Sequence, residues 1–204
     1  MSKYGLLDPG TCLPVLESIF NVFDINNTLE FGAGVWSTFS LIRNSKKVTS
    51  IENIKEWVQK VEDDYSHKNN LNVIHWTKPM NEYLKEITDN FDLIFIDGDD
   101  RIECLRDSFN RSPIIVCHDT HQPKMGWADV DVPENYEQLT YFGCLPYYTT
   151  IFSIKDINIK NVLLDINNFT HKNSCIDRNF WTTQTLKEIY YLKSQEQRKR
   201  SIKI

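Results

Sequence analysis

Residues 29–38 read Leu29-Glu30-Phe31-Gly32-Ala33-Gly34-Val35-Trp36-Ser37-Thr38. The first part is a short run typical of a strand, the middle is a G-x-G turn, and we expect a helix from about Ser37. Glycines let the backbone turn tightly and let a ligand approach the main chain. Because ligands bind at the carboxyl ends of parallel strands, this turn is a candidate binding site if its strand belongs to a parallel sheet.

The first 120 residues alternate between strand-like and helix-like runs. Short apolar runs predict strands at Thr28–Phe31, Val48–Glu52, Asn72–Trp76, Phe91–Asp97 and Pro113–His118. Periodic stretches predict helices at about Leu13–Phe23, Ser37–Asn44, Ile54–Tyr65, Met80–Thr88 and Asp100–Asn110. Repeated strand–helix units predict an α/β fold, in which a parallel sheet is covered by helices on both faces.

This alternation stops after His118. Breakers and aromatic residues fill residues 119–146, and we interpret this irregular segment as a substrate lid beside the site. Tyr147–Ile154 and Asn161–Ile166 resemble two strands that would close the sheet as an antiparallel pair, and a final helix is expected at Thr183–Arg198. The sequence therefore predicts three layers and a mostly parallel sheet of seven strands.

Length and composition favour one domain spanning residues 1–204. The chain has 204 residues, 41% of them hydrophobic, and no apolar run of the ~20 residues needed to cross a bilayer. The first residues do not resemble a signal peptide, and the five cysteines have no metal or disulfide spacing. We therefore expect a cytoplasmic protein that does not bind membranes. No sequence feature assigns an oligomeric state.

The net charge of −5 is unevenly distributed. Five basic residues and one acidic residue in 193–204 give this segment a charge of +4, which leaves −9 on the rest of the chain. A basic end segment, 183–204, could bind nucleic acid. It is also typical of an ordinary helix end, because cations near a helix C-terminus are favourable, and we prefer that interpretation.

Glu52 supports a nucleoside site at the glycine turn. It ends the second predicted strand, 20 residues beyond Gly32, where an acidic side chain accepts hydrogen bonds from ribose hydroxyls in nucleoside-binding folds. A dinucleotide site would place a third glycine at the position of Ser37. Glu30 suits a cationic group better than a pyrophosphate, and the sequence contains no P-loop motif.

These motifs together resemble those of a known family. Glu30-Phe31-Gly32-Ala33-Gly34 followed by Ser37-Thr38 resembles the E-x-G-x-G signature of class I S-adenosylmethionine-dependent methyltransferases, which have a Rossmann-like fold. Ser50-Ile51-Glu52-Asn53 is similar to the family's second-strand acid, and residues 91–98 are similar to its fourth strand. Residues 114–120 resemble a fifth strand ending in His-Asp, as in many small-molecule O-methyltransferases.

The resemblance implies S-adenosylmethionine as the cofactor. By position, it assigns cofactor binding to Glu30, Gly32, Ala33, Gly34, Ser37, Thr38, Glu52, Asn53, Trp76, Thr77 and Asp97. Many relatives have a histidine where this chain has Asp100, so no catalytic role is carried over to that position. Where relatives often have an acidic adenine contact, Trp76 would stack on the base and Thr77 would donate a hydrogen bond.

Candidate catalytic residues lie at the ends of the fourth and fifth predicted strands: Asp97, His118 and Asp119. Methyl transfer needs orientation, desolvation and in some cases a general base. His118 could act as that base or simply cap its strand, and Asp119 could hold the acceptor. Asp97 and Asp119 could alternatively share Mg²⁺. We expect no metal, because a third ligand is not evident and His118 with His121 alone does not make a zinc site.

The acceptor is expected to be a small molecule, methylated at oxygen. The acidic run Asp97–Asp100 opposes phosphate binding, and motifs typical of base methylation are missing from the sequence. The alternatives are a nucleic-acid or protein methyltransferase that uses the basic end segment, and a binding module that keeps the fold without catalysis.

Overall fold

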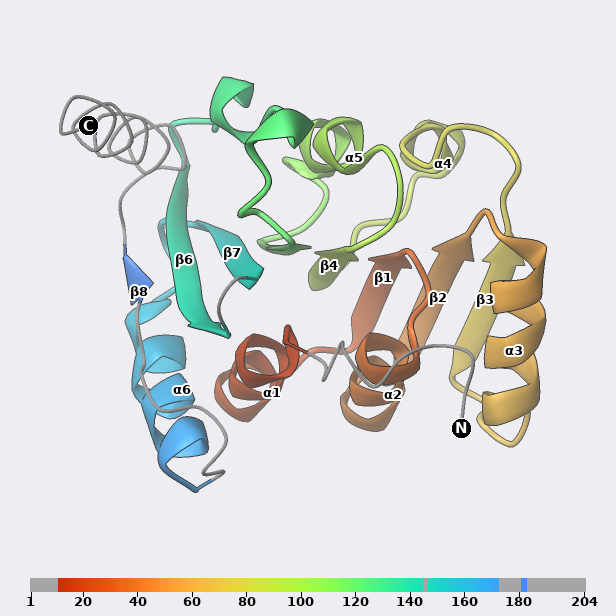
Figure 1. The fold of residues 1–204 in the computed structure, drawn as a ribbon, viewed down its shortest axis with the longest axis horizontal. Helices are drawn as coiled ribbons and strands as arrows, with labels where there is room; N and C mark the ends of the chain where they lie inside the picture. Colours follow the sequence, from red (N-terminus) through yellow and green to blue (C-terminus); the bar gives the residue numbers. More distant parts are fainter. Residues whose placement is uncertain (1–10, 145–146, 173–180, 183–204) are drawn as a thin grey trace, which may run out of the picture.

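The computed structural model describes residues 11–144, 147–172 and 181–182 (Figure 1). The helix expected at Thr183–Arg198 and the basic segment 183–204 lie outside the described residues. None of the helices within the described ranges is both long and apolar enough to cross a membrane.

One sheet organises the described chain, in the strand order β3-β2-β1-β4-β5-β7-β6-β8. The strands are β1 (Asn27–Phe31), β2 (Lys47–Glu52), β3 (Leu71–His75), β4 (Leu93–Ile96), β5 (Ile114–His118), β6 (Tyr136–Cys144), β7 (Tyr147–Ile154) and β8 (Trp181–Thr182). The first five are parallel, and β7 is antiparallel to both β5 and β6. The predicted fold class is confirmed, with the two-residue β8 added at the edge beside β6.

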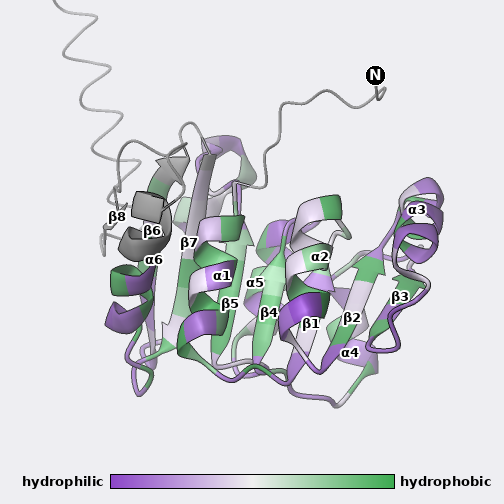
Figure 2. Ribbon diagram, turned by 90° about the horizontal axis from the view of Figure 1, so that it is seen from below, coloured by the Kyte–Doolittle hydropathy of each residue, from purple (hydrophilic) through white to green (hydrophobic). Residues whose placement is uncertain are grey.

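Helices cover both faces of the sheet, which gives three layers (Figure 1). The helices are α1 (Leu13–Val22), α2 (Val35–Asn44), α3 (Lys55–Tyr65), α4 (Glu82–Glu86), α5 (Arg101–Ser108) and α6 (Lys160–Lys172). One buried cluster joins the sheet to α1, α2 and α6, and a second joins it to α4 and α5. Figure 2 shows the matching pattern: the strands are rich in hydrophobic residues, whereas the helices carry both hydrophobic and hydrophilic residues.

The end of the chain corrects two sequence predictions. Asn161–Ile166 was expected to be a strand, but it belongs to α6. Val162, Leu163 and Ile166 are buried whereas Leu164 is exposed, which is a helical spacing, since a strand would place 162, 164 and 166 on one face. The antiparallel pair is β6 with β7, and β6 comes from the segment expected to be irregular.

The connection from β5 to β6, residues 119–135, takes the place of a crossover helix. It contains two short 3₁₀ turns, Pro123–Met125 and Trp127–Asp129, and lies beside α5 (Figure 1). The buried Trp127 ring anchors it to the cluster under α4 and α5. The irregular segment expected at 119–146 is therefore correct for 119–135 and wrong for 136–144, and its role as a lid stays a prediction.

Candidate cofactor and active site

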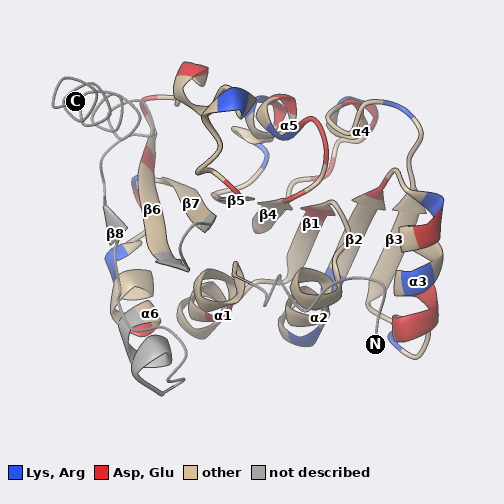
Figure 3. Cartoon of the chain, viewed as in Figure 1, with Lys and Arg blue, Asp and Glu red and all other residues tan. Residues whose placement is uncertain are grey.

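The strand order reverses between β1 and β4, which is where open α/β sheets bind ligands. Predicted site residues from four strands meet at this carboxyl edge: Glu30 on β1, Glu52 on β2, Asp97 after β4 and His118 on β5. Figure 3 shows acidic residues gathered along the same edge. The topology thus brings together residues that lie up to 88 positions apart in the sequence.

Gly32 is required by a close main-chain contact. Its φ is +89°, and a Cβ atom there would lie 2.4 Å from the Gly98 nitrogen. The Asp97 amide also donates to the Phe31 carbonyl at 2.8 Å, so the loops after β1 and β4 are held against each other. The sequence interpretation assigned the glycines to a tight turn and to ligand approach. At Gly32 the positive φ fits the turn, and the protein's own main chain occupies the space that a side chain would take.

Glu30 is completely buried beneath the first turn of α2. Its Oε2 accepts hydrogen bonds from Thr38 Oγ1 at 2.7 Å and from the Ser50 hydroxyl. Its Oε1 is buried and has no hydrogen-bond partner. Burial raises the pKa of Glu30 to about 7, against the opposing effect of hydrogen bonds from Ser50, Thr38 and Ser37.

Thr38 connects Glu30 to the glycine turn. While its hydroxyl donates to Glu30, the same oxygen accepts from the Gly34 amide at 3.0 Å. Ser37, at the position where a dinucleotide site needs glycine, is buried and also donates to Glu30. The acidic residue and both hydroxyl residues of the motif therefore form one hydrogen-bonded unit that fixes the shape of the turn.

Glu52 lies next to the turn at the end of β2. Its Oε1 accepts from the Ile54 amide at 2.7 Å, and the amides of Asn53 and Ala33 also lie within its reach. Burial raises the pKa of Glu52, and these backbone amides oppose the shift. A carboxylate held by amides at this point is oriented to accept hydrogen bonds from a diol.

The remaining predicted cofactor residues lie around the ends of β2 and β3. Asn53 donates to Asp99 Oδ2 at 2.8 Å, which links the loops after β2 and β4. The indole nitrogen of Trp76 donates to the Pro79 carbonyl at 3.0 Å, and the ring meets Tyr83 edge to face. Thr77 is exposed. Stacking of a base on Trp76 and a hydrogen bond from Thr77 stay predictions.

Arg101 organises the ends of β4 and β5, a role that sequence reasoning missed. Its guanidinium donates to the carbonyls of Gly98, Asp97 and His118 at 2.8–3.1 Å. It also pairs with Asp97 Oδ1 and Asp119 Oδ2, each at 3.1 Å. Planar guanidinium groups suit this fan of acceptors. The only available signal was an arginine four residues after a strand-end aspartate.

His118 is buried, and both of its ring nitrogens face threonine hydroxyls. Nε2 lies 2.8 Å from Thr11 Oγ1, and Nδ1 lies 3.4 Å from Thr149 Oγ1. In this arrangement the imidazole is held firmly, and a base role would require one nitrogen to exchange its hydroxyl for the acceptor.

Asp119 adopts a left-handed backbone conformation with φ 58°, and its side chain is 19% exposed. Arg101 holds Oδ2, whereas Oδ1 has no hydrogen-bond partner. Oδ1 lies 3.9 Å from His118 Nε2 and 3.8 Å from His121 Nδ1. The geometry therefore leaves one carboxylate oxygen beside two imidazoles and fixes the other.

Metal binding by Asp97 and Asp119 would compete with Arg101, because the guanidinium already contacts an oxygen of each carboxylate. Across residues 11–144, 147–172 and 181–182, no group of three or more histidine, cysteine or carboxylate side chains is arranged to hold a metal.

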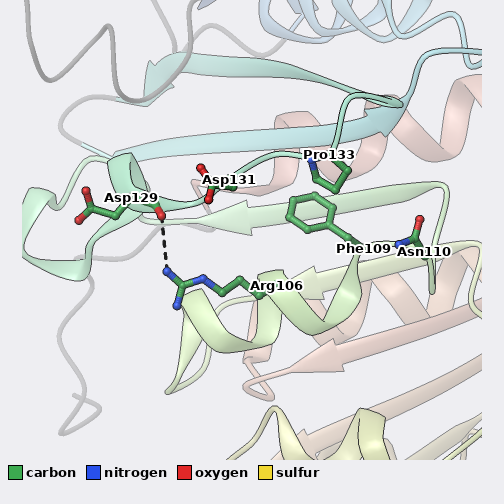
Figure 4. A pocket seen from close by; sticks show the side chains of 6 residues that line it. All are labelled: Arg106, Phe109, Asn110, Asp129, Asp131 and Pro133. Carbon is green, nitrogen blue, oxygen red and sulfur yellow. Dashed lines mark hydrogen bonds between the residues drawn. The ribbon is translucent and has the colours of Figure 1, made fainter.

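A cavity of about 370 Å³ lies between α5 and the end of the β5–β6 connection (Figure 4). Phe109 and Pro133 face each other across it, and Arg106 donates to the Asp129 carbonyl at 3.5 Å on one side. Its lining contains none of the predicted site residues. It is therefore separate from the strand-end site.

Comparison with known proteins gives structural matches only. No protein-family model matches the sequence, and no curated protein matches it. An rRNA methylase from Streptococcus thermophilus superposes with a TM-score of 0.55 at 12% identity, covering 68% of this chain and 93% of that one. The N-methyltransferase NodS from Bradyrhizobium japonicum WM9, in complex with S-adenosyl-L-homocysteine, also gives 0.55, at 13% identity with 75% and 90% covered. At these identities the likeness establishes the fold, which is one used by methyltransferases.

Proposed function

We propose that this protein is an S-adenosylmethionine-dependent methyltransferase that transfers the methyl group to an oxygen atom of a small-molecule acceptor. One observation carries the proposal: the glycine turn lies between two buried acidic side chains, Glu30 and Glu52, at the point where the strand order reverses. The same edge carries Asp97 and Asp119, beside the place where an acceptor would approach.

The charge of the site favours this cofactor over a dinucleotide. Glu30, Glu52 and Asp97 surround the turn, and Arg101, the cation that lies between Asp97 and Asp119, is already paired with both. A pyrophosphate would be repelled by these carboxylates, whereas a ligand carrying a sulfonium and an ammonium group would be attracted. The solved complex of NodS with S-adenosyl-L-homocysteine supports the same ligand class on this fold.

When bound, S-adenosylmethionine supplies a methyl group on a positively charged sulfur. Glu52 would accept hydrogen bonds from the ribose hydroxyls, because backbone amides hold its carboxylate at the end of β2. The unit formed by Glu30, Thr38 and Gly34 would keep the turn in its binding shape. Asp97 would lie beside the methionine part of the cofactor.

The acceptor would bind at the ends of β4 and β5. Asp119 Oδ1 is buried and has no hydrogen-bond partner, so it would receive a hydrogen bond from an acceptor hydroxyl that enters beside it, while Arg101 holds the other carboxylate oxygen. His118 would orient this region or receive the hydroxyl proton after releasing Thr11.

We also propose a cytoplasmic location, from the reduced-thiol pattern of the cysteines.

RNA is the second candidate acceptor, because one structural neighbour is described as an rRNA methylase. The acidic edge of the sheet in Figure 3 favours a small molecule instead, since phosphates would be repelled there. Transfer of labelled methyl groups to a small-molecule extract, compared with total RNA, separates the two. Label found only in RNA would reject the small-molecule proposal.

Calorimetry tests the cofactor assignment. We expect S-adenosylmethionine to bind with a dissociation constant in the micromolar range and NAD to give no signal. Glu52→Gln should weaken S-adenosylmethionine at least about tenfold, because a charged acceptor of two hydroxyl hydrogen bonds is lost. Glu62→Gln, an exposed change on α3, is the matched control and should leave the affinity unchanged. Preferential binding of NAD would overturn the proposal.

A further inference from the structure

Glu30 is a buried carboxyl group that no cation of the protein neutralises. It is 0% exposed, and within the described part of the chain no lysine, arginine or histidine forms an ion pair with it. Hydroxyl groups satisfy Oε2, while Oε1 has no hydrogen-bond partner. An ionised carboxylate in such a place is costly unless a positive charge or a proton compensates it.

The carboxyl group is also connected to the ligand-binding turn. Thr38 donates a hydrogen bond to Glu30 and accepts one from the Gly34 amide. A single hydroxyl group therefore connects the Glu30 carboxyl group to the main chain of the turn. A positive charge placed over the turn would interact with Glu30 through a region from which water is excluded, where charges interact more strongly than in water. The structure therefore holds one negative charge ready for a cationic ligand.

We infer that Glu30 makes the turn selective for the charge of the cofactor, so that S-adenosylmethionine binds more tightly than S-adenosylhomocysteine. This inference rests on the proposed function. The two molecules share the adenosine, the ammonium and the carboxylate and differ in the methyl group with its sulfonium charge. Selection by charge would favour the substrate form of the cofactor and speed release of the neutral product.

The selectivity depends on pH because Glu30 must be ionised to exert it. The groups that face Glu30 are the hydroxyls of Ser37 and Thr38 from α2 and of Ser50 from β2, with the negative charge of Asp97 after β4. Tyr65 on α3 also interacts with it electrostatically. With the pKa of Glu30 raised to about 7 by burial, the free protein carries a proton there in mildly acidic solution. Binding of the sulfonium would then release that proton.

Calorimetric titration of both ligands into wild type and Glu30→Gln tests the inference. At about pH 8, wild type should bind S-adenosylmethionine about tenfold more tightly than S-adenosylhomocysteine, and Glu30→Gln should bring the ratio close to one. Glu62→Gln, the exposed change on α3, is the matched control, because it removes a carboxylate away from the turn and should leave the ratio unchanged. A ratio that survives Glu30→Gln would overturn the inference.

A second measurement uses the wild-type protein alone, so it does not depend on the variant folding. The affinity ratio should rise as the pH increases from about 6 to about 8. Titrations in buffers of different ionisation enthalpy at about pH 6.5 should show proton release with S-adenosylmethionine and less with S-adenosylhomocysteine. A ratio independent of pH, with equal proton release, would reject the inference. If neither ligand binds wild type, the proposed function fails instead.

Discussion

Glu30 couples the stability of the ligand-free protein to pH. Its folded-state pKa, raised to about 7 by burial, exceeds the ordinary carboxyl value of 4.5. Between these values the folded protein binds a proton that the unfolded chain has lost, so stability decreases as pH rises through this window and then stays low. The candidate site therefore keeps a destabilising buried carboxyl group, as is typical of binding sites.

We predict that Glu30→Gln removes this dependence. Relative to the variant, wild type should lose about 3 kcal/mol of unfolding free energy between about pH 4.5 and pH 8, from about 2.5 pKa units at 1.36 kcal/mol each. Urea denaturation of both proteins at several pH values measures the difference. Parallel curves for the two proteins would show that Glu30 titrates normally in the fold.

Gly32 allows a second prediction at the residue scale. Gly32→Ala should destabilise the protein by about 3 kcal/mol, because strain at positive φ adds to a clash with the Gly98 main chain. Gly126→Ala is the control: Gly126 also has positive φ, but the nearest atom to an added Cβ is 3.8 Å away. That variant should lose only about 1 kcal/mol. Equal losses in thermal unfolding would argue against the contact between the two loops.

Among the elements, β4 and β5 are joined at their carboxyl ends by one side chain, Arg101, which is 15% exposed. Replacing it by methionine leaves Asp97 and Asp119 without their cation and three carbonyls without a donor. We predict that Arg101→Met lowers the free energy of unfolding by about 3 kcal/mol. Arg101→Lys should lower it less, because lysine keeps the charge but not the several N–H donors of the guanidinium group. Denaturant titration measures both losses. Variants as stable as wild type would mean that the pairing is dispensable.

Helix α6 provides a test of the corrected secondary structure. Ile166→Ala should cost about 3 kcal/mol, because Ile166 is 0% exposed against α1 and the sheet. Leu164→Ala should cost less than about 0.5 kcal/mol, because Leu164 is 64% exposed. If the segment were a strand, these two residues would share a face and the two losses would be similar.

The sequence predicted the parallel strands well because β4 and β5 are continuous apolar runs buried on both faces. It missed β6 because polar residues, Glu137 and Gln138, interrupt the buried pattern of Tyr136, Leu139 and Tyr141. It misassigned Asn161–Ile166 because a short segment with four apolar residues out of six fits both a strand and a helix. Neighbouring elements, rather than local sequence, decide such segments.

The candidate site was predictable in its position but not in its contacts. The turn, Glu30 and Glu52 follow from motif spacing and lie together as expected. The role of Arg101 does not follow from the sequence, because two of its partners, His118 and Asp119, lie at and just after the end of β5. The burial of His118 between Thr11 and Thr149 could not be predicted from the sequence either, since these residues are up to 138 positions apart.

For the molecule as a whole, the described residues form one sheet with acidic residues at the carboxyl ends of its parallel strands (Figure 3). We propose that this edge, at the turn between β1 and α2, binds S-adenosylmethionine. A crystal structure of the complex with S-adenosylhomocysteine is the decisive measurement. We expect the ribose within hydrogen-bond distance of Glu52 and the sulfur above the turn at Gly32–Gly34. A ligand bound elsewhere, or a ribose that does not contact Glu52, would contradict it.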